Sequence, residues 1–161
     1  MNILNRTDRT GLVANVVAAV VTVIAVNAVI FLSGWFQTDT PAAQQSRLDP
    51  PGWLVGVVWV FLFAFLGAAR WLVVRSGGER AGRQAGYIVL LLLFCLAYPF
   101  YTMGLKSVAI GLIGNVTTII AAAWVASRVR TSSKAAAGLV LPVVAWVSFA
   151  TVLTALMLHG S

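Results

Sequence analysis

The chain has 161 residues, of which 60% are hydrophobic and only 9% are charged, and its formal net charge is +7. A soluble domain has about 25% charged residues, so this composition cannot cover a water-facing surface and indicates an integral membrane protein. The basic residues lie in short gaps between apolar runs instead of forming one basic face, which argues against a nucleic-acid partner.

Five apolar segments follow one another along the chain, each about as long as the roughly 20-residue helix that crosses a bilayer. They are continuously apolar, which favours helices over the alternating strands of a membrane barrel. The sequence therefore predicts an all-α fold, an integral membrane bundle of five transmembrane helices in one domain spanning residues 1–161. The predicted helices cover about residues 11–33, 52–74, 85–105, 107–126 and 135–158, and the connector at 34–51 is the longest. The first segment is longer than the roughly 7–15-residue core of a signal peptide, so it is interpreted as a retained helix.

The basic residues between these segments predict an orientation. Those of the N-terminus and of the second and fourth connectors fall on one side: Arg6, Arg9, Arg75, Arg80, Arg83, Arg128, Arg130 and Lys134. The first and third connectors carry only Arg47 and Lys106. Because positive charge stays on the cytoplasmic side, the N-terminus is expected inside and the C-terminus outside, which requires an odd number of helices. Arg70 lies inside the second segment near its inner end, from where it can snorkel. The Ala-, Val- and Arg-rich composition suggests a bacterial cell membrane.

Groups that carry catalysis or bind metals are sparse. Cys95 and His159 are the only cysteine and histidine, so no intrachain disulfide and no cluster of metal ligands is predicted. The acidic residues all lie outside the apolar runs: Asp8, Asp39, Asp49 and Glu79. We therefore expect no catalytic residue, no metal, no intrinsic cofactor and no proton or ion translocation.

Six tryptophans divide into two groups. Four lie near segment ends, which is typical of an interfacial belt: Trp35, Trp53, Trp71 and Trp124. Trp59 and Trp146 lie well inside their segments and need another explanation. In the second segment a single stripe at helical spacing contains Gly56, Trp59, Phe63 and Gly67. Glycines in such a stripe either let a neighbouring backbone approach or leave room for a flat ligand.

The third and fifth segments also combine aromatic residues with a proline. Trp146, Phe149, Ala150 and Leu153 form a stripe after Pro142. Phe94, Tyr98 and Tyr101 share a face around Pro99. Proline bends a membrane helix and frees a carbonyl. Two interpretations stay open, an apolar cavity between bent helices or ordinary helix packing. The amides inside the first and fourth segments, Asn15, Asn27 and Asn115, are expected to hydrogen-bond neighbouring helices.

Two stretches together resemble a known family. Residues 50–53 read P-P-G-W, and they are followed along the second segment by Gly56, Trp59, Phe63, Gly67 and Trp71. Residues 141–153 read L-P-V-V-A-W-V-S-F-A-T-V-L. With the five segments and the long first connector, residues of about 48–157 resemble the TspO/MBR family of tryptophan-rich sensory proteins, also called the translocator protein or peripheral-type benzodiazepine receptor family.

The chain departs from the family pattern at several positions. Val57 stands where the family has proline, Phe63 where it has tyrosine, Tyr98 where it has tryptophan and Thr154 where it has asparagine. The end of the fifth segment also lacks the family's aromatic and basic residues, which weakens any transfer of the cholesterol-recognition motif. The chain is therefore interpreted as a divergent member.

The resemblance implies a receptor- or transporter-like protein that binds porphyrins, haem-like molecules or other flat hydrophobic ligands. Family members are homodimers with a pocket between helices, covered by the first connector like a lid. The expected ligand-binding residues are Trp53, Trp146, Phe149, Ala150, Tyr98, Trp59 and Arg47, the last facing a porphyrin propionate or simply solvent. Light-dependent porphyrin degradation, reported for some members, is interpreted as a side reaction, so the chain is not expected to be an enzyme. The expected partners are the bilayer and a tetrapyrrole or sterol-like molecule; the alternative is a non-catalytic assembly or scaffold subunit.

Overall fold

The computed structural model describes residues 6–33, 50–100 and 107–159, and within these ranges it contains five α-helices and no strand. In chain order they are α1 (Arg6–Ser33), α2 (Gly52–Ser76), α3 (Ala81–Leu96), α4 (Val108–Val129) and α5 (Lys134–His159). The predicted all-α class and the five helical segments are confirmed. The predicted lid and Arg47, Trp35, Tyr101 and Lys106 lie outside the described residues.

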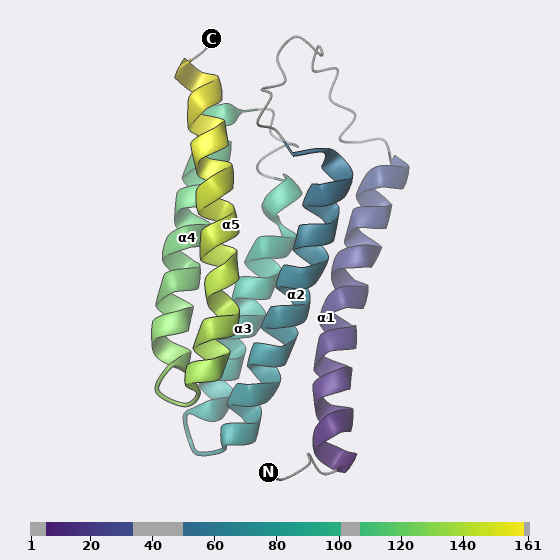
Figure 1. Cartoon of the computed structure of the whole chain (residues 1–161), viewed down its shortest axis with the longest axis vertical. Helices are drawn as coiled ribbons and strands as arrows, with labels where there is room; N and C mark the ends of the chain where they lie inside the picture. Colours follow the sequence, from purple (N-terminus) through teal and green to yellow (C-terminus); the bar gives the residue numbers. More distant parts are fainter. Residues whose placement is uncertain (1–5, 34–49, 101–106, 160–161) are drawn as a thin grey trace.

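The helices stand side by side and alternate in direction (Figure 1). The start of α1 and the α2–α3 and α4–α5 connections share one end, which we call the basic end because it carries Arg75, Arg80, Arg83, Arg128, Arg130 and Lys134. The end of α5 and the start of α2 lie at the opposite end. Positive φ angles at Gly77 (69°) and Gly78 (84°) permit the tight α2–α3 turn. The predicted clustering of positive charge on one side of the bundle thus has a structural counterpart.

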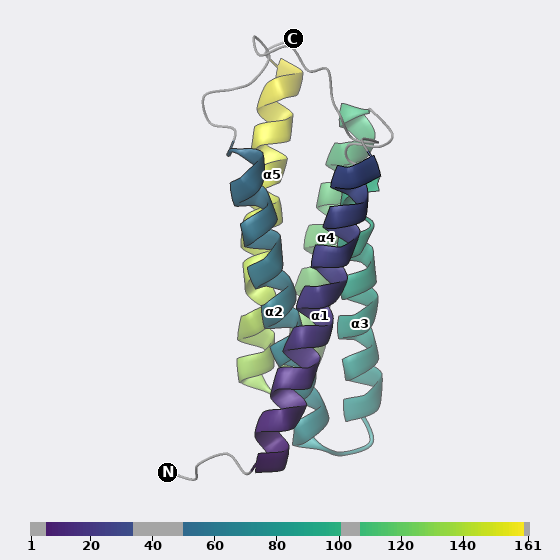
Figure 2. The ribbon, with the colours of Figure 1, turned by 90° about the vertical axis from the view of Figure 1, so that its right-hand side faces the viewer.

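Helix α2 is the centre of the bundle. It packs against α1, α3 and α5, while α4 packs against α5 and α3. The contact between α1 and α3 is slight. Figure 2 shows α1 running obliquely across the face of the bundle between α2 and α3. This arrangement leaves α1 dependent on α2 for most of its contacts.

Four helices are long and apolar enough to cross a membrane, namely α1, α2, α4 and α5. Helix α3 is apolar but has 16 residues, fewer than the about 20 that span a bilayer core. Of the predicted segment 85–105, α3 covers the first part and begins earlier, at Ala81, and ends at Leu96. Residues 98–100 are helical again after Ala97, and residues 101–105 lie outside the described residues. Pro99 supplies no N–H for a helical bond to the Cys95 carbonyl one turn earlier. The chain turns at Ala97, whose carbonyl accepts from the Phe100 N–H at 3.0 Å. Pro142, in contrast, lies inside the uninterrupted α5.

The surface of the bundle is as apolar as its interior. The core combines side chains from α2, α3, α4 and α5, including Leu66, Ile88, Val129, Val140 and Val143, all fully buried. Large apolar side chains on the outer faces are exposed, among them Leu32 at 82%, Leu90 at 64% and Ile113 at 66%. Soluble proteins rarely expose apolar patches of this extent, whereas lipid is as apolar as these side chains. The surface is therefore that of a protein embedded in lipid.

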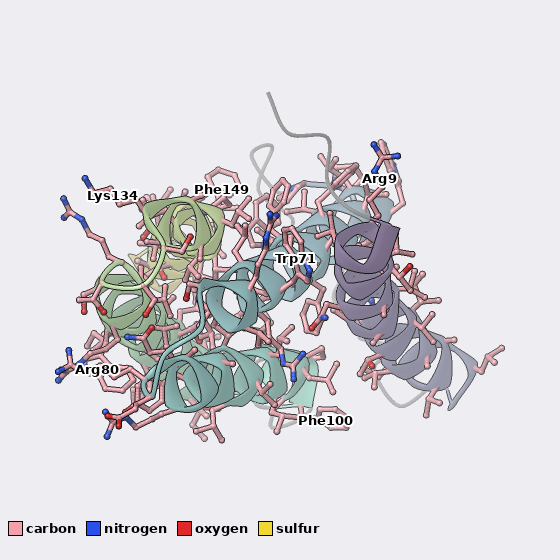
Figure 3. All side chains as sticks on the ribbon, turned by 90° about the horizontal axis from the view of Figure 1, so that it is seen from below. Arg9, Trp71, Arg80, Phe100, Lys134 and Phe149 are labelled. Carbon is pink, nitrogen blue, oxygen red and sulfur yellow. The ribbon has the colours of Figure 1, made fainter. Side chains whose placement is uncertain are left out.

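The contact between α1 and α2 depends on a glycine. A Cβ atom on Gly67 would lie 2.6 Å from the Asn15 carbonyl oxygen and 3.0 Å from the Val16 Cα, so the two backbones touch. One turn further along α2, the Trp71 indole lies against Gly11, and Figure 3 shows it between the two helices. The glycines of this stripe were expected either to let a neighbouring backbone approach or to leave room for a ligand. Gly67 lets the α1 backbone approach α2. The interpretation of Trp71 as a belt residue was wrong, because α1 covers it to 9% exposure.

Candidate ligand-binding site

The predicted site residues are distributed over three regions of the bundle. The first is an interior cluster of Trp59 from α2, Tyr98 from the short helical segment after α3 and Asn115 from α4. The Trp59 and Tyr98 rings are 5.0 Å apart between centroids, at an interplanar angle of 49°. Trp59 also meets Phe63 edge-on at 6.2 Å. Because Trp59 is 8% exposed and Asn115 1% exposed, this cluster is part of the interior.

The Asn115 amide is only partly satisfied. Its side chain is within hydrogen-bonding reach of the Tyr98 hydroxyl, and its Oδ1 has no hydrogen-bond partner among the described residues. This contact supports the prediction that Asn115 bonds a neighbouring segment. A buried acceptor without a donor costs about 1–3 kcal/mol, so Asn115 Oδ1 is a site where a guest N–H or O–H would be stabilised.

The second region lies on α5. Trp146 is half-buried against the core, and its ring is 5.7 Å from that of Phe149 at an angle of 39°. Phe149 is 43% exposed and projects from the outer side of α5 (Figure 3), while Ala150 is half-buried. The predicted stripe therefore divides, since Trp146 packs against the interior and Phe149 reaches the lipid-facing surface.

The third region is the entry of α2, at the end opposite the basic end. Trp53 lies in the first turn after Pro51 and is 70% exposed. One turn further on, no described atom lies within 4 Å of the position that a Cβ on Gly56 would take. Trp53, an exposed ring, thus stands beside open backbone at this entry, away from the Trp59 and Trp146 contacts.

The sequence alone did not indicate a cavity between α1, α2 and α3. It is lined mainly by apolar side chains, with Asn15, Thr22 and Arg70 as its polar members. Arg70, the single charge inside the second apolar segment, was the one sequence feature that could have pointed to this cavity. We had interpreted it as a side chain that snorkels to the membrane surface. The Arg70 Nη1 donates to the Asn15 Oδ1, so the amide expected to bond a neighbouring helix does so through this arginine.

These features define a class, a helical membrane protein whose five described helices surround a mainly aliphatic interior that also holds Trp59, Phe63 and Asn115. The model of the TspO/MBR family matches residues 16–159. The tryptophan-rich protein TspO of Chlorobaculum tepidum is 30% identical over 107 residues, which cover 65% of this chain and 68% of that protein. The chain therefore belongs to the TspO/MBR family, membrane proteins of the sensory and transport type.

Proposed function

We propose that the protein binds a porphyrin or another flat hydrophobic molecule between its helices and takes part in tetrapyrrole transport or sensing. The proposed binding residues are Trp53, Trp59, Tyr98, Trp146, Phe149 and Ala150, together with Arg47 from the first connector. The observation that carries the proposal is the interior cluster, because it combines aromatic rings from α2 and the segment after α3 with an Asn115 acceptor that has no donor among the described residues.

The chemistry of these groups suits a tetrapyrrole. Aromatic side chains hold a flat guest by offset stacking and edge contacts, and a pyrrole N–H supplies the donor that Asn115 Oδ1 lacks. Trp53, exposed at the entry of α2, would be the first ring that a guest meets. The open backbone at Gly56 leaves space beside the path from that entry to Trp59.

The wider assignments belong to the same proposal. The bundle is one domain in a bacterial cell membrane, with the basic end in the cytoplasm, α3 crossing as a fifth span, the connector at 34–51 acting as a lid, and two copies forming a homodimer. Its role is binding, not catalysis. Protoporphyrin kept in the dark with the purified protein should therefore remain intact, whereas dark turnover would favour an enzyme.

A fluorescence titration tests the binding. Protoporphyrin added to purified protein in detergent should quench tryptophan emission saturably, and Trp146→Phe should weaken the apparent affinity several-fold. Trp124→Phe is the matched control, because Trp124 lies at the basic end against Tyr87 and Arg128. Quenching no stronger than that of free N-acetyltryptophanamide, or unchanged in Trp146→Phe, would contradict the proposal.

One observation favours the alternative of an assembly or scaffold subunit. Trp59 and Phe63 are 8% and 1% exposed and pack within the core, as rings used only for packing would. That alternative requires a constant protein partner, so a stoichiometric second protein that co-purifies from the native membrane, together with absent porphyrin binding, would favour it.

A further inference from the structure

Among the side chains that the structure describes, no acidic group lies against the half-buried charge of Arg70. Arg70 is half-buried, six residues before the end of α2 at Ser76, which is about 9 Å along the helix at 1.5 Å per residue. Its Nη1 donates to Asn15 Oδ1, and the Asn15 Nδ2 donates to the Gly11 carbonyl at 2.8 Å. That second bond holds the amide with its oxygen toward Arg70, but an amide carries no negative charge. A cation at membrane depth is costly unless paired or hydrated.

Arg70 lies where two cavities meet. The first, of about 290 Å³, extends between α1, α2 and α3. The second, of about 540 Å³, continues between α2 and α3 toward the basic end and brings in Arg83. No acidic residue is among the described residues that line either cavity. Two guanidinium groups therefore border this pair of cavities without a carboxylate from the described residues that line it.

The charged and amide groups of the first cavity lie at one end of it, and Thr22 at the other end donates its hydroxyl to the Ala18 carbonyl at 2.7 Å. Arg70 and Asn15 lie nearest the basic end, and Phe63 and Leu96 lie furthest from it, with apolar side chains of α1 and α3 between. On α1 the lining runs from Asn15 to Thr22, about 10 Å at 1.5 Å per residue. A charged group near the membrane surface followed by an apolar channel toward the midplane has the polarity of a lipid of that leaflet.

We propose that these cavities bind a membrane-borne acidic amphiphile, with its oxyanion head on Arg70 and Arg83 and its acyl chain along Ala18, Leu92 and Leu93. Arginine forms bidentate bonds with carboxylate and phosphate, so an anionic phospholipid and a free fatty acid both supply this chemistry. The site is separate from Trp53, Trp59 and Trp146, and it does not depend on the proposed porphyrin binding.

Native mass spectrometry tests the site. Protein reconstituted in equal parts of phosphatidylcholine and phosphatidylglycerol should retain phosphatidylglycerol selectively, and a parallel sample with oleate separates the fatty acid from the phospholipid. Arg70→Gln should reduce the retained anion about tenfold, the factor for about 1.4 kcal/mol of lost charge-assisted bonding. Arg70→Lys should retain part of it, and the exposed Arg130→Gln should change nothing.

A second variant leaves the arginine intact. Ala18 lines the first cavity but is exposed, so Ala18→Phe should block the acyl chain without disturbing the core; Ala25→Phe, also exposed on α1, is its control. The site is supported if retention of phosphatidylglycerol or oleate falls in Arg70→Gln and Ala18→Phe but not in the controls Arg130→Gln and Ala25→Phe. Equal retention in wild type and Arg70→Gln, or equal retention of phosphatidylcholine, overturns it. Protoporphyrin quenching should be unchanged in both variants, so failure of one proposal does not imply failure of the other.

Discussion

The two halves of α2 share one helix but have opposite surroundings. In the half toward the basic end, α1 lies so close that a Cβ on Gly67 would clash with the Asn15 carbonyl, and Trp71 is buried. In the other half Gly56 faces open space and Trp53 is 70% exposed. The glycine and tryptophan of one half, Gly67 and Trp71, therefore pack against α1. Those of the other half, Gly56 and Trp53, form an open surface that we assign to a ligand.

The largest effect is expected from closing the backbone contact. Gly67→Ala places a methyl group 2.6 Å from a backbone oxygen that cannot rotate away, so α1 must move from α2. Overpacking of this kind costs about 1–3 kcal/mol. The free energy of unfolding in mixed micelles measures it, and an unchanged value would mean that α1 docks without this contact.

Next in size is the interior cluster beside the open half of α2. Tyr98→Phe removes the hydroxyl that faces the Asn115 amide, which deprives a buried amide of a hydrogen-bonding neighbour. The expected loss of stability is about 1–2 kcal/mol in the same unfolding experiment. The double variant Tyr98→Phe with Asn115→Leu should recover part of this loss, and a further additive loss would show that the hydrogen bond is not the cause.

Trp53→Ala should separate stability from binding. The ring is exposed, so the free energy of unfolding should change by less than about 0.5 kcal/mol. The apparent dissociation constant for protoporphyrin should rise several-fold if the proposed entry is correct. Trp71→Ala gives the opposite pattern, with lost stability from its contact with Gly11 and little change in porphyrin affinity.

The smallest effect is expected at Gly56. Gly56→Ala adds a methyl group into open space, and the gain in helix propensity over glycine is at most about 1 kcal/mol. Stability should stay level or rise slightly, in contrast to Gly67→Ala. Destabilisation as large as that of Gly67→Ala would remove the distinction between the two halves of α2.

The sequence was sufficient for the number and approximate position of the helices, because long apolar runs have few other solutions in lipid. The end of α3 was not predictable from hydropathy, since apolar residues continue past Leu96 and through the turn at Ala97 where the helix ends. Trp71 shows the same limit, because its place near a helix end is visible in sequence but its cover by Gly11 is not. The meeting of Asn15 with Arg70 and that of Tyr98 with Asn115 depend on the relative rotation of helices far apart in the chain.

Pro142 has a mechanical consequence for α5. It has no amide hydrogen to offer the Gly138 carbonyl one turn earlier, and Gly138 carries no side chain that braces the helix at this level. The segment after Pro142 carries the contacting rings of Trp146 and Phe149, and a missing backbone bond makes a helix easier to bend at that level. A bend there would move both rings together, so in the binding that we propose α5 would meet guests of different thickness by a change of angle and not by separate movements of each ring.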